Sequence, residues 1–171
     1  MKQIGKTIIE SGININLEHK NRSTIRAVII RDNKVLMLYS SLYNDYTFPG
    51  GGIKASETHI DALIRELNEE LGAINVDIIK PLGYTLEYRY GINSNDSIYL
   101  QKSYFYLVNT KITEQPQFIG REKEQGLHAI YVNPEEIIHH NNKINTTRGK
   151  GFKTVLIREN IILNYILKHL I

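Results

Sequence analysis

An apolar ridge at helical spacing sets one early segment of this 171-residue chain apart from its neighbours. Over residues 56–71 the ridge recurs at steps of three and four, in the order Ile60, Leu63, Leu67 and Leu71. This period is typical of an amphipathic helix. Ser56 is a suitable N-cap, Glu57 places an acid in the first turn, and Gly72 is a typical C-terminal residue. The pattern therefore predicts one helix set among segments of a different period.

The segments around this helix have period two and are rich in β-branched and aromatic residues, which predicts strands. Short polar turns divide them into two expected hairpins, 23–30 with 34–39 and 81–90 with 97–109. A shorter strand is expected at 127–132.

Helical spacing returns near the end of the chain, at 152–170, and Pro134 suits the first turn of a shorter helix before it. Strands packed by helices predict an α+β or layered fold. The length suits a single domain over residues 1–171. Within it we expect residues 1–22 to be an N-terminal extension or an edge strand, and residues 151–171 to carry the C-terminal helix.

The composition excludes several classes of site and partner. Cysteine is absent, which removes disulfides, iron–sulfur clusters, thiolate zinc sites and cysteine nucleophiles. The net charge of +3 could attract an anionic substrate but does not predict wrapping of nucleic acid. No stretch approaches the roughly twenty apolar residues that span a bilayer, and residues 1–15 lack the pattern of a signal peptide. We therefore expect a soluble, cytoplasmic protein with no membrane partner.

Three carboxylates of the predicted helix share one face, because Glu66, Glu69 and Glu70 stand at positions i, i+3 and i+4. Like charges at this spacing repel one another unless a hard cation lies among their oxygens, and oxygen ligands suit Mg²⁺ or Mn²⁺. Upstream, residues 50–52 are three glycines, whose uncovered backbone can approach a metal ion or a phosphate closely. These are the parts needed to bind a metal–diphosphate.

Residues 51–73 resemble the Nudix box, which fixes a glycine, a glutamate, an Arg-Glu pair, a Glu-Glu pair and a second glycine at set intervals. The matching positions are Gly51, Glu57, Arg65, Glu66, Leu67, Glu69, Glu70 and Gly72. Only the last position departs, since Ala73 is smaller than the usual Ile, Leu or Val. The resemblance implies an α/β fold of the Nudix type, an α/β/α sandwich with a mixed β-sheet packed between helices.

The same resemblance implies roles for individual residues. The carboxylates that match the family's metal-binding and base-supplying positions are Glu66, Glu69 and Glu70. Glu57 and Arg65 match the residues that hold the loop and orient those glutamates, and a carbonyl of Gly50 or Gly51 is a further expected ligand. The residues alone support this division, because Glu57 is about half a helical turn from Glu66 and is better placed to pair with Arg65.

The implied activity is hydrolysis of the diphosphate linkage in a nucleoside diphosphate derivative, with Mg²⁺ or Mn²⁺ as cofactor. One alternative is another chemistry of the same family, such as that of a non-hydrolytic isomerase, and the complete box argues for hydrolysis instead. The other alternative is a binding module of the same fold that senses a nucleotide such as ADP-ribose, or contacts RNA, without turnover. Such modules are expected to lose carboxylates of the box, and none is lost here. We expect a small nucleotide substrate rather than nucleic acid, while base, sugar and oligomeric state, a homodimer included, stay open.

Three residues outside the box are candidates for substrate binding. Tyr88, in the tyrosine-rich hairpin, could stack on a nucleobase, although strand tyrosines are more often half-packed on a sheet. Many Nudix enzymes place another glutamate on a loop before a late strand. Glu122 and Glu124 precede the strand expected at 127–132, and their spacing does not choose between them.

Overall fold

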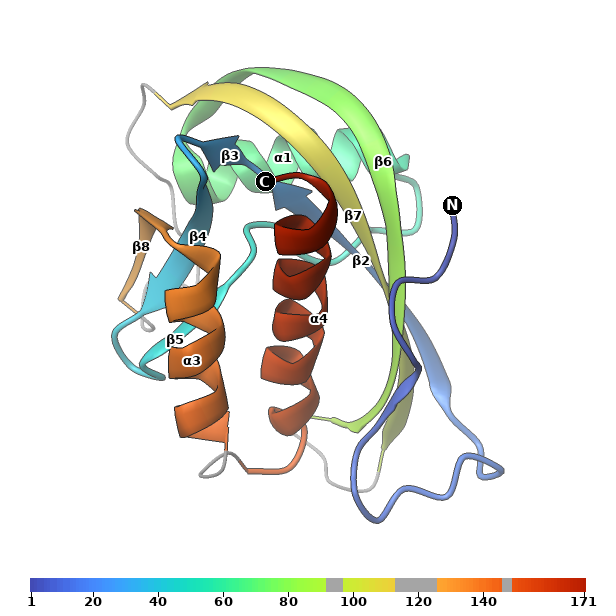
Figure 1. Ribbon diagram of the computed structural model, residues 1–171. Coiled ribbons are helices and arrows are strands. Elements are labelled where there is room, and N and C mark those ends of the chain that lie inside the picture. Colours follow the sequence, from blue (N-terminus) through green and yellow to red (C-terminus); the bar gives the residue numbers. More distant parts are fainter. Residues whose placement is uncertain (92–96, 113–125, 146–148) are drawn as a thin grey trace.

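Two β-sheets form the middle layer of the protein in a computed structural model that describes residues 1–91, 97–112, 126–145 and 149–171 (Figure 1). The first sheet has the order β1 (Ile8–Ile9), β6 (Ala73–Tyr90), β7 (Ile98–Ile112) and β2 (Lys20–Val28). Strands β6 and β7 pair antiparallel, whereas β1 joins β6 and β2 joins β7 in parallel. This sheet is therefore mixed.

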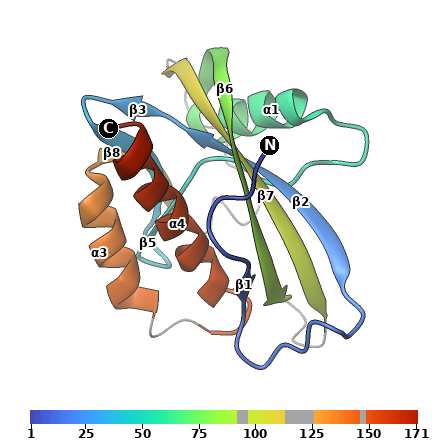
Figure 2. The same cartoon turned by 45° about the vertical axis from the view of Figure 1, so that its right-hand side comes forward.

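The second sheet is centred on β4 (Lys34–Ser40). Strands β3 (Ile30–Arg31), β5 (Asp45–Thr47) and β8 (Leu127–Val132) all pair antiparallel with it. Two views at 45° to each other show α1 (His59–Leu71) on one side of the sheets, and α3 (Pro134–Asn145) and α4 (Lys153–His169) on the other (Figures 1 and 2). The expected α/β/α sandwich is confirmed.

The apolar side chains of the strands point alternately to the two sides of the sheets and form two separate cores, one under each helical layer. On β2, Ile25 and Ala27 join the core beneath α1, whereas Val28 joins the core beneath α3 and α4. On β4, Leu36 and Leu38 face α1, and Val35 and Met37 face the opposite side. Successive strand residues point to opposite faces, so period-two runs that are apolar on both faces suit strands covered on both sides.

The first predicted hairpin is wrong. The run at 23–30 does not fold back as one strand onto 34–39, because it divides near Ile29 between the two sheets. Residues Lys20–Val28 pair in parallel with β7, and only Ile30–Arg31 turns into β4, through positive-φ residues at Asp32 and Asn33. The second predicted hairpin is present as β6 and β7, with β6 starting earlier than expected, at Ala73.

Helix α1 begins at His59, two residues later than the predicted cap at Ser56 implies. Its N-cap is Thr58 rather than Ser56, and the Thr58 side chain accepts a hydrogen bond from the backbone N–H of Asp61. At the other end Gly72 adopts the left-handed conformation (φ 58°) and its N–H reaches the carbonyl of Asn68 at 2.9 Å, as its sequence position predicted. The buried face includes Leu63 and Leu67, and it also carries two carboxylates that are described below.

The N-terminal segment packs along the outer edge of the first sheet. Strand β1 pairs with β6, and the buried carboxylate of Glu10 accepts hydrogen bonds from the N–H groups of Tyr90 (2.9 Å) and Gly151 (2.7 Å). These contacts tie the end of β6 to the turn before α4. Within the described ranges, no helix has both the length and the apolar character needed to cross a membrane.

Candidate active site

The glycine-rich segment at 49–53 lies along the edge of β2 that β7 leaves open. The N–H groups of Ile25 and Ala27 donate to the carbonyls of Gly51 and Pro49, both at 2.9 Å. These bonds fix the path of the loop, so its carbonyl oxygens have defined positions rather than those of a free turn.

Neither Gly50 nor Gly51 has room for a side chain. At Gly50 φ is +126°, and a Cβ would collide with the backbone carbonyl of Ile25. A Cβ on Gly51 would lie 2.5 Å from the carboxylate oxygens of Glu66. The loop therefore approaches both β2 and α1 more closely than any other residue type would permit.

Two of the three predicted carboxylates are buried against this loop. Glu66 and Glu70 are 6% and 4% exposed, and both line a cavity of about 350 Å³. Glu70 Oε2 accepts the N–H of Gly50 at 2.6 Å. Glu69 lies differently: its side chain is 29% exposed, does not line the cavity, and approaches Arg65 Nη1 at 3.5 Å.

Arg65 joins the loop to the carboxylate face of α1. Its guanidinium donates to Glu57 at 2.5 Å, to Glu66 Oε1 at 2.7 Å and to the carbonyl of Gly52 at 3.0 Å. Glu57 also accepts the N–H of Lys54, which closes the turn before the helix. The bond from Arg65 lowers the pKa of Glu57 from 4.5 to about 2, and the same pair raises the pKa of Arg65.

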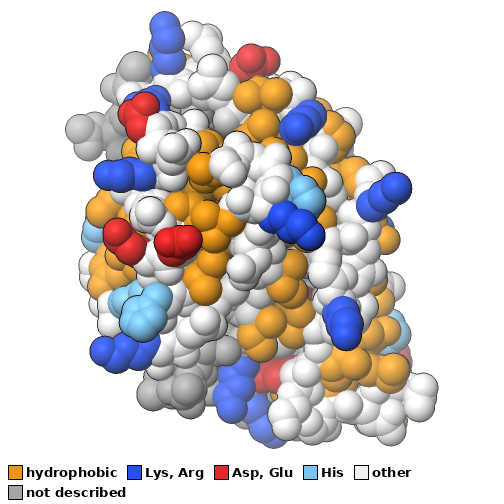
Figure 3. Space-filling view, viewed as in Figure 1, with side chains coloured by type: hydrophobic (Ala, Val, Ile, Leu, Met, Phe, Trp, Pro, Cys, Tyr) orange, Lys and Arg blue, Asp and Glu red, His pale blue; other side chains and the backbone are white. Residues whose placement is uncertain are grey.

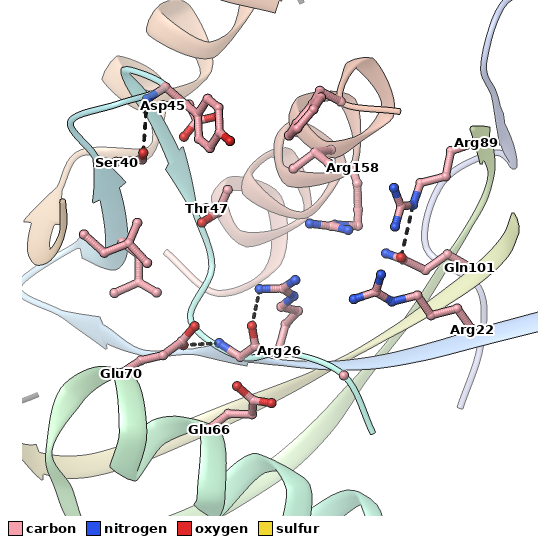
Figure 4. A pocket seen from close by; sticks show the side chains of 18 residues that line it. Arg22, Arg26, Ser40, Asp45, Thr47, Glu66, Glu70, Arg89, Gln101 and Arg158 are labelled. Atoms are coloured by element: carbon pink, nitrogen blue, oxygen red, sulfur yellow. Dashed lines mark hydrogen bonds between the residues drawn. The ribbon is translucent and has the colours of Figure 1, made fainter. Parts of the chain in front are cut away.

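The cavity extends from this carboxylate face toward the start of α4. Figure 4 shows Glu66 and Glu70 at one side and a group of guanidinium groups at the other. The arginines that line the cavity are Arg22, Arg26, Arg89 and Arg158. They come from β2, β6 and α4, so three elements far apart in sequence bring them together.

The inner arginines are held in contrasting ways. Arg158, 2% exposed, forms ion pairs with two fully buried carboxylates, Glu87 at 2.9 Å and the adjacent Glu159. Arg26 instead donates to the carbonyls of Phe48, at 2.9 Å, and Gly50. Burial lowers the pKa of Arg26, and the nearby Arg158 lowers it further. The carboxylates of Glu159, Glu70 and Glu66 raise it only in part, so this partly buried guanidinium, whose hydrogen-bond acceptors are neutral carbonyls, is well placed to receive an anion.

The family assignment follows from a sequence comparison. The model of the NUDIX domain matches residues 20–154, which span the glycine loop, the carboxylate helix and all strands from β2 onward. The chain belongs to the Nudix hydrolase family. The match ends at residue 154, in the first turn of α4. The residues that line the cavity therefore lie within the matched range, apart from Val155 and Arg158.

Relatives agree with this placement. An RNA pyrophosphohydrolase from Sulfurovum sp. (strain NBC37-1) is 28% identical over 129 residues, which covers 72% of this chain and 80% of that protein. An RNA pyrophosphohydrolase from Helicobacter pylori (strain P12) is 35% identical over 69 residues, or 39% of this chain and 44% of that protein. A Nudix hydrolase structure from Nitrosomonas europaea shares the fold, with a TM-score of 0.53, 21% identity, and coverage of 82% of this chain and 88% of that one.

Nudix hydrolases generally use a divalent metal ion, so the donor set matters. Among the described residues, no three His, Cys, Asp or Glu side chains come close enough together to hold an ion. What the site presents is the pair of buried carboxylates, Glu66 and Glu70, against the loop of Gly50 and Gly51, whose carbonyls accept hydrogen bonds from Arg26 and from the Ile25 N–H. This is an all-oxygen donor set, which suits a hard cation, and Glu69 would have to turn from Arg65 to join it.

None of the three candidates for substrate binding is placed at the cavity by the described residues. The structure does not bring Tyr88 to the cavity: its ring meets the ring of His19 edge-on, with centroids 5.5 Å apart. Two other aromatic residues line the cavity mouth instead, Tyr43 and Phe152, with ring centroids 5.5 Å apart. Glu122 and Glu124 fall outside the described residues.

The sequence interpretation did not single out the cavity arginines. A usable signal was present, because Arg26 interrupts the apolar run of β2 and Arg158 adjoins Glu159 on a largely apolar helix. Charges inside such runs are costly to bury without partners, so they mark either a buried ion pair or a site. Arg158 is part of a buried ion pair, and Arg26 lies at the candidate site.

Proposed function

We propose that this chain hydrolyses a pyrophosphate linkage in a nucleotide derivative, with Mg²⁺ or Mn²⁺ as cofactor. The observation that carries the proposal is the meeting of two buried carboxylates, Glu66 and Glu70, with a side-chain-free loop at one wall of an arginine-lined cavity. The carboxylates suit a cation and the arginines suit phosphate oxygens. A diphosphate group needs both at once.

Metal binding is assigned to Glu66, Glu69 and Glu70, with a carbonyl of Gly50 or Gly51 as a further ligand. When bound, a divalent ion would neutralise charge on the diphosphate and lower the pKa of a coordinated water molecule. Arg65 orients Glu66 through the 2.7 Å bond, and the Gly50 N–H orients Glu70. Both carboxylates are thereby held in place before substrate arrives, which is the arrangement that electrostatic catalysis requires.

The chemical step requires a proton acceptor and a stabiliser of phosphate charge. A water oxygen attacks one phosphorus atom, the bond from that phosphorus to the bridging oxygen breaks, and one of the three glutamates accepts the proton of the water. Arg26 is positioned to bind the non-bridging oxygens, because its guanidinium lies beside Gly50 and faces the cavity.

An RNA end is the second candidate substrate, and the relatives' names favour it. A pyrophosphate linkage occurs in RNA only at a 5′ end that bears a di- or triphosphate or a cap, so the chemistry at the carboxylates is the same. The alternative of a binding module without turnover is less well supported, since Arg65 and all three glutamates of the box are retained.

A release assay tests the proposal. Phosphate and pyrophosphate release, together with chromatography of the nucleotide products, is measured over nucleoside triphosphates, ADP-ribose, dinucleoside polyphosphates and a 5′-triphosphorylated RNA, each with Mg²⁺, Mn²⁺ or EDTA. Chromatography is needed because ADP-ribose and dinucleoside polyphosphates are cleaved into two nucleotide or sugar phosphates. We expect cleavage of at least one substrate with metal and none with EDTA. Binding without turnover over the whole panel would replace hydrolysis by the sensing module.

A further inference from the structure

The cavity holds a second cationic group away from its carboxylates. In Figure 4, Arg22, Arg89 and Gln101 gather at the side opposite Glu66 and Glu70, with the other two arginines between. On the visible face of Figure 3, by contrast, Lys and Arg side chains are spread among neutral and apolar ones. The clustering in the cavity therefore differs from the distribution on this face.

Arg89 is a buried cation whose hydrogen-bond acceptors in the described chain are neutral groups. It is 4% exposed and donates to Gln101 Oε1 (3.2 Å), to the carbonyl of Gly151 (3.2 Å) and to that of Tyr90 (3.4 Å). Within the described part of the chain it forms no ion pair with a carboxylate. Burial lowers the pKa of Arg89, as do Arg22 and Arg158, whereas the carboxylates of Glu87 and Glu10 raise it. The pKa stays lowered despite these carboxylates, so they compensate the burial of the guanidinium only in part, and a bound anion would compensate it further.

Arg22 lies at the same side of the cavity as Arg89, on β2, which β7 separates from the β6 strand of Arg89 (Figure 4). It is exposed on β2, where it is paired in register with Gln101, and it lines the cavity. No hydrogen bond or ion pair ties its guanidinium to any residue in the described ranges. Two guanidinium groups at the same side of a cavity repel each other, and a phosphate that both can reach removes that repulsion and accepts several hydrogen bonds.

The position of this pair separates it from the linkage that is cleaved. Arg22 and Arg26 are four residues apart on one strand face, so their Cα atoms lie about 13 Å apart. Arg26, beside Gly50 and Glu70, is already assigned to the oxygens of the diphosphate that is cleaved. Arg158, between the two ends, is neutralised by Glu87 and Glu159. An anion at Arg22 and Arg89 is thus a different group of the substrate.

We propose that Arg22 and Arg89 form a second phosphate subsite, which binds a phosphate on the 3′ side of the nucleotide whose pyrophosphate is cleaved. This inference rests on the proposed function. The phosphate comes from one of two sources, a 3′-phosphomonoester on a small nucleotide or the phosphodiester that leads to the next nucleotide of an oligonucleotide.

Calorimetric titration of the whole protein tests the subsite without turnover. The probes are AMP, adenosine 3′,5′-bisphosphate and the 5′-phosphorylated dinucleotide pApA, none of which contains a pyrophosphate linkage. We expect at least one of the two larger probes to bind the wild-type protein about tenfold more tightly than AMP, because charge-assisted hydrogen bonds contribute that much. A preference for pApA over the bisphosphate identifies the phosphodiester, and the reverse identifies the monoester.

The variant Arg22→Gln should lose most of this preference, and the matched control Arg31→Gln should keep it. Arg31 is also exposed, lies over the ring of Tyr131 at 5.0 Å and is not part of the cavity wall. Equal affinity of the wild-type protein for all three probes, or an unchanged preference in Arg22→Gln, overturns the subsite. Failure of the release assay overturns hydrolysis instead, so the two outcomes are distinguishable.

Discussion

The carboxylate of Glu66 occupies the space in which a side chain at Gly51 would stand, since a Cβ there would lie 2.5 Å from both carboxylate oxygens. A glycine of the loop and a glutamate of the helix, fifteen positions apart in the sequence, are thus in direct contact. The fixed spacing of the box has a steric basis here. The loop backbone can lie against the carboxylate only when position 51 has no Cβ.

Substitution of this glycine is the first test. Gly51→Ala should push the Glu66 side chain away from the cavity and lower turnover at least tenfold, with a smaller thermal shift on addition of Mn²⁺. The neighbouring variant Gly52→Ala is the matched control, because a Cβ there meets no atom within 4 Å. Turnover and melting temperature are measured for both. A similar loss in the two variants would show that Glu66 is not the cause.

Removal of one charge at Glu70 tests the metal site. Glu70→Gln keeps an oxygen that can accept the Gly50 N–H, so the metal-free protein should melt at nearly the wild-type temperature. The stabilisation by Mn²⁺ should fall, because the stabilisation of a fold by a ligand increases with the logarithm of the ligand's affinity. The control is Glu135→Gln, an exposed glutamate in the first turn of α3. An Mn²⁺ shift of wild-type size in Glu70→Gln would count against this ligand.

The ion pair of Glu57 and Arg65 predicts a dependence of stability on pH. The pKa of Glu57 is lowered to about 2 in the folded protein, from 4.5, so the unfolded chain binds more protons between these values. The stabilisation is complete above pH about 5 and is lost as the pH falls toward 2. Urea unfolding of the wild-type protein and Glu57→Gln should therefore differ at pH 6 and converge toward pH 3. A difference independent of pH would contradict the ion pair.

The buried pairs of Arg158 predict a large loss on truncation. Arg158→Ala leaves Glu87 and Glu159, both 0% exposed, without their counter-charge, and should destabilise the fold by about 3–5 kcal/mol. The triple variant that also carries Glu87→Gln and Glu159→Gln should recover part of this loss. Urea unfolding measures both. A cost below about 1 kcal/mol for Arg158→Ala would mean that the charges are not buried as described.

The local residue pattern was sufficient to predict most helices and strands, but not which strands pair with each other. The period of α1 predicted this helix because its apolar side chains form one buried face. Strand β8 was also predicted from its local run of residues, although none of them is fully buried. The pairing of β2 with β7 joins segments about eighty residues apart, and no local signal reports it. The helix start was misplaced because Thr58, rather than Ser56, supplies the cap, while Lys54 and Glu57 close a separate turn before it.

The candidate site was predictable only where spacing fixes geometry. The box brought Glu57, Arg65, Glu66 and Glu70 into one contiguous group, and these lie together in the structure. The alternation of side chains along a strand could not show which face of β6 lines the cavity. That face carries Arg89, so its neighbour Tyr88 points away.

Steady-state hydrolysis by the wild-type protein and by Glu70→Gln, measured on the best substrate of the panel over a titration of Mg²⁺, tests the central claim most directly. The account predicts metal-dependent turnover that EDTA abolishes, and a fall in kcat of about a hundredfold or more in Glu70→Gln, since charge stabilisation at such a centre is worth several kcal/mol. Turnover that persists in EDTA, or a wild-type kcat in Glu70→Gln, would contradict it.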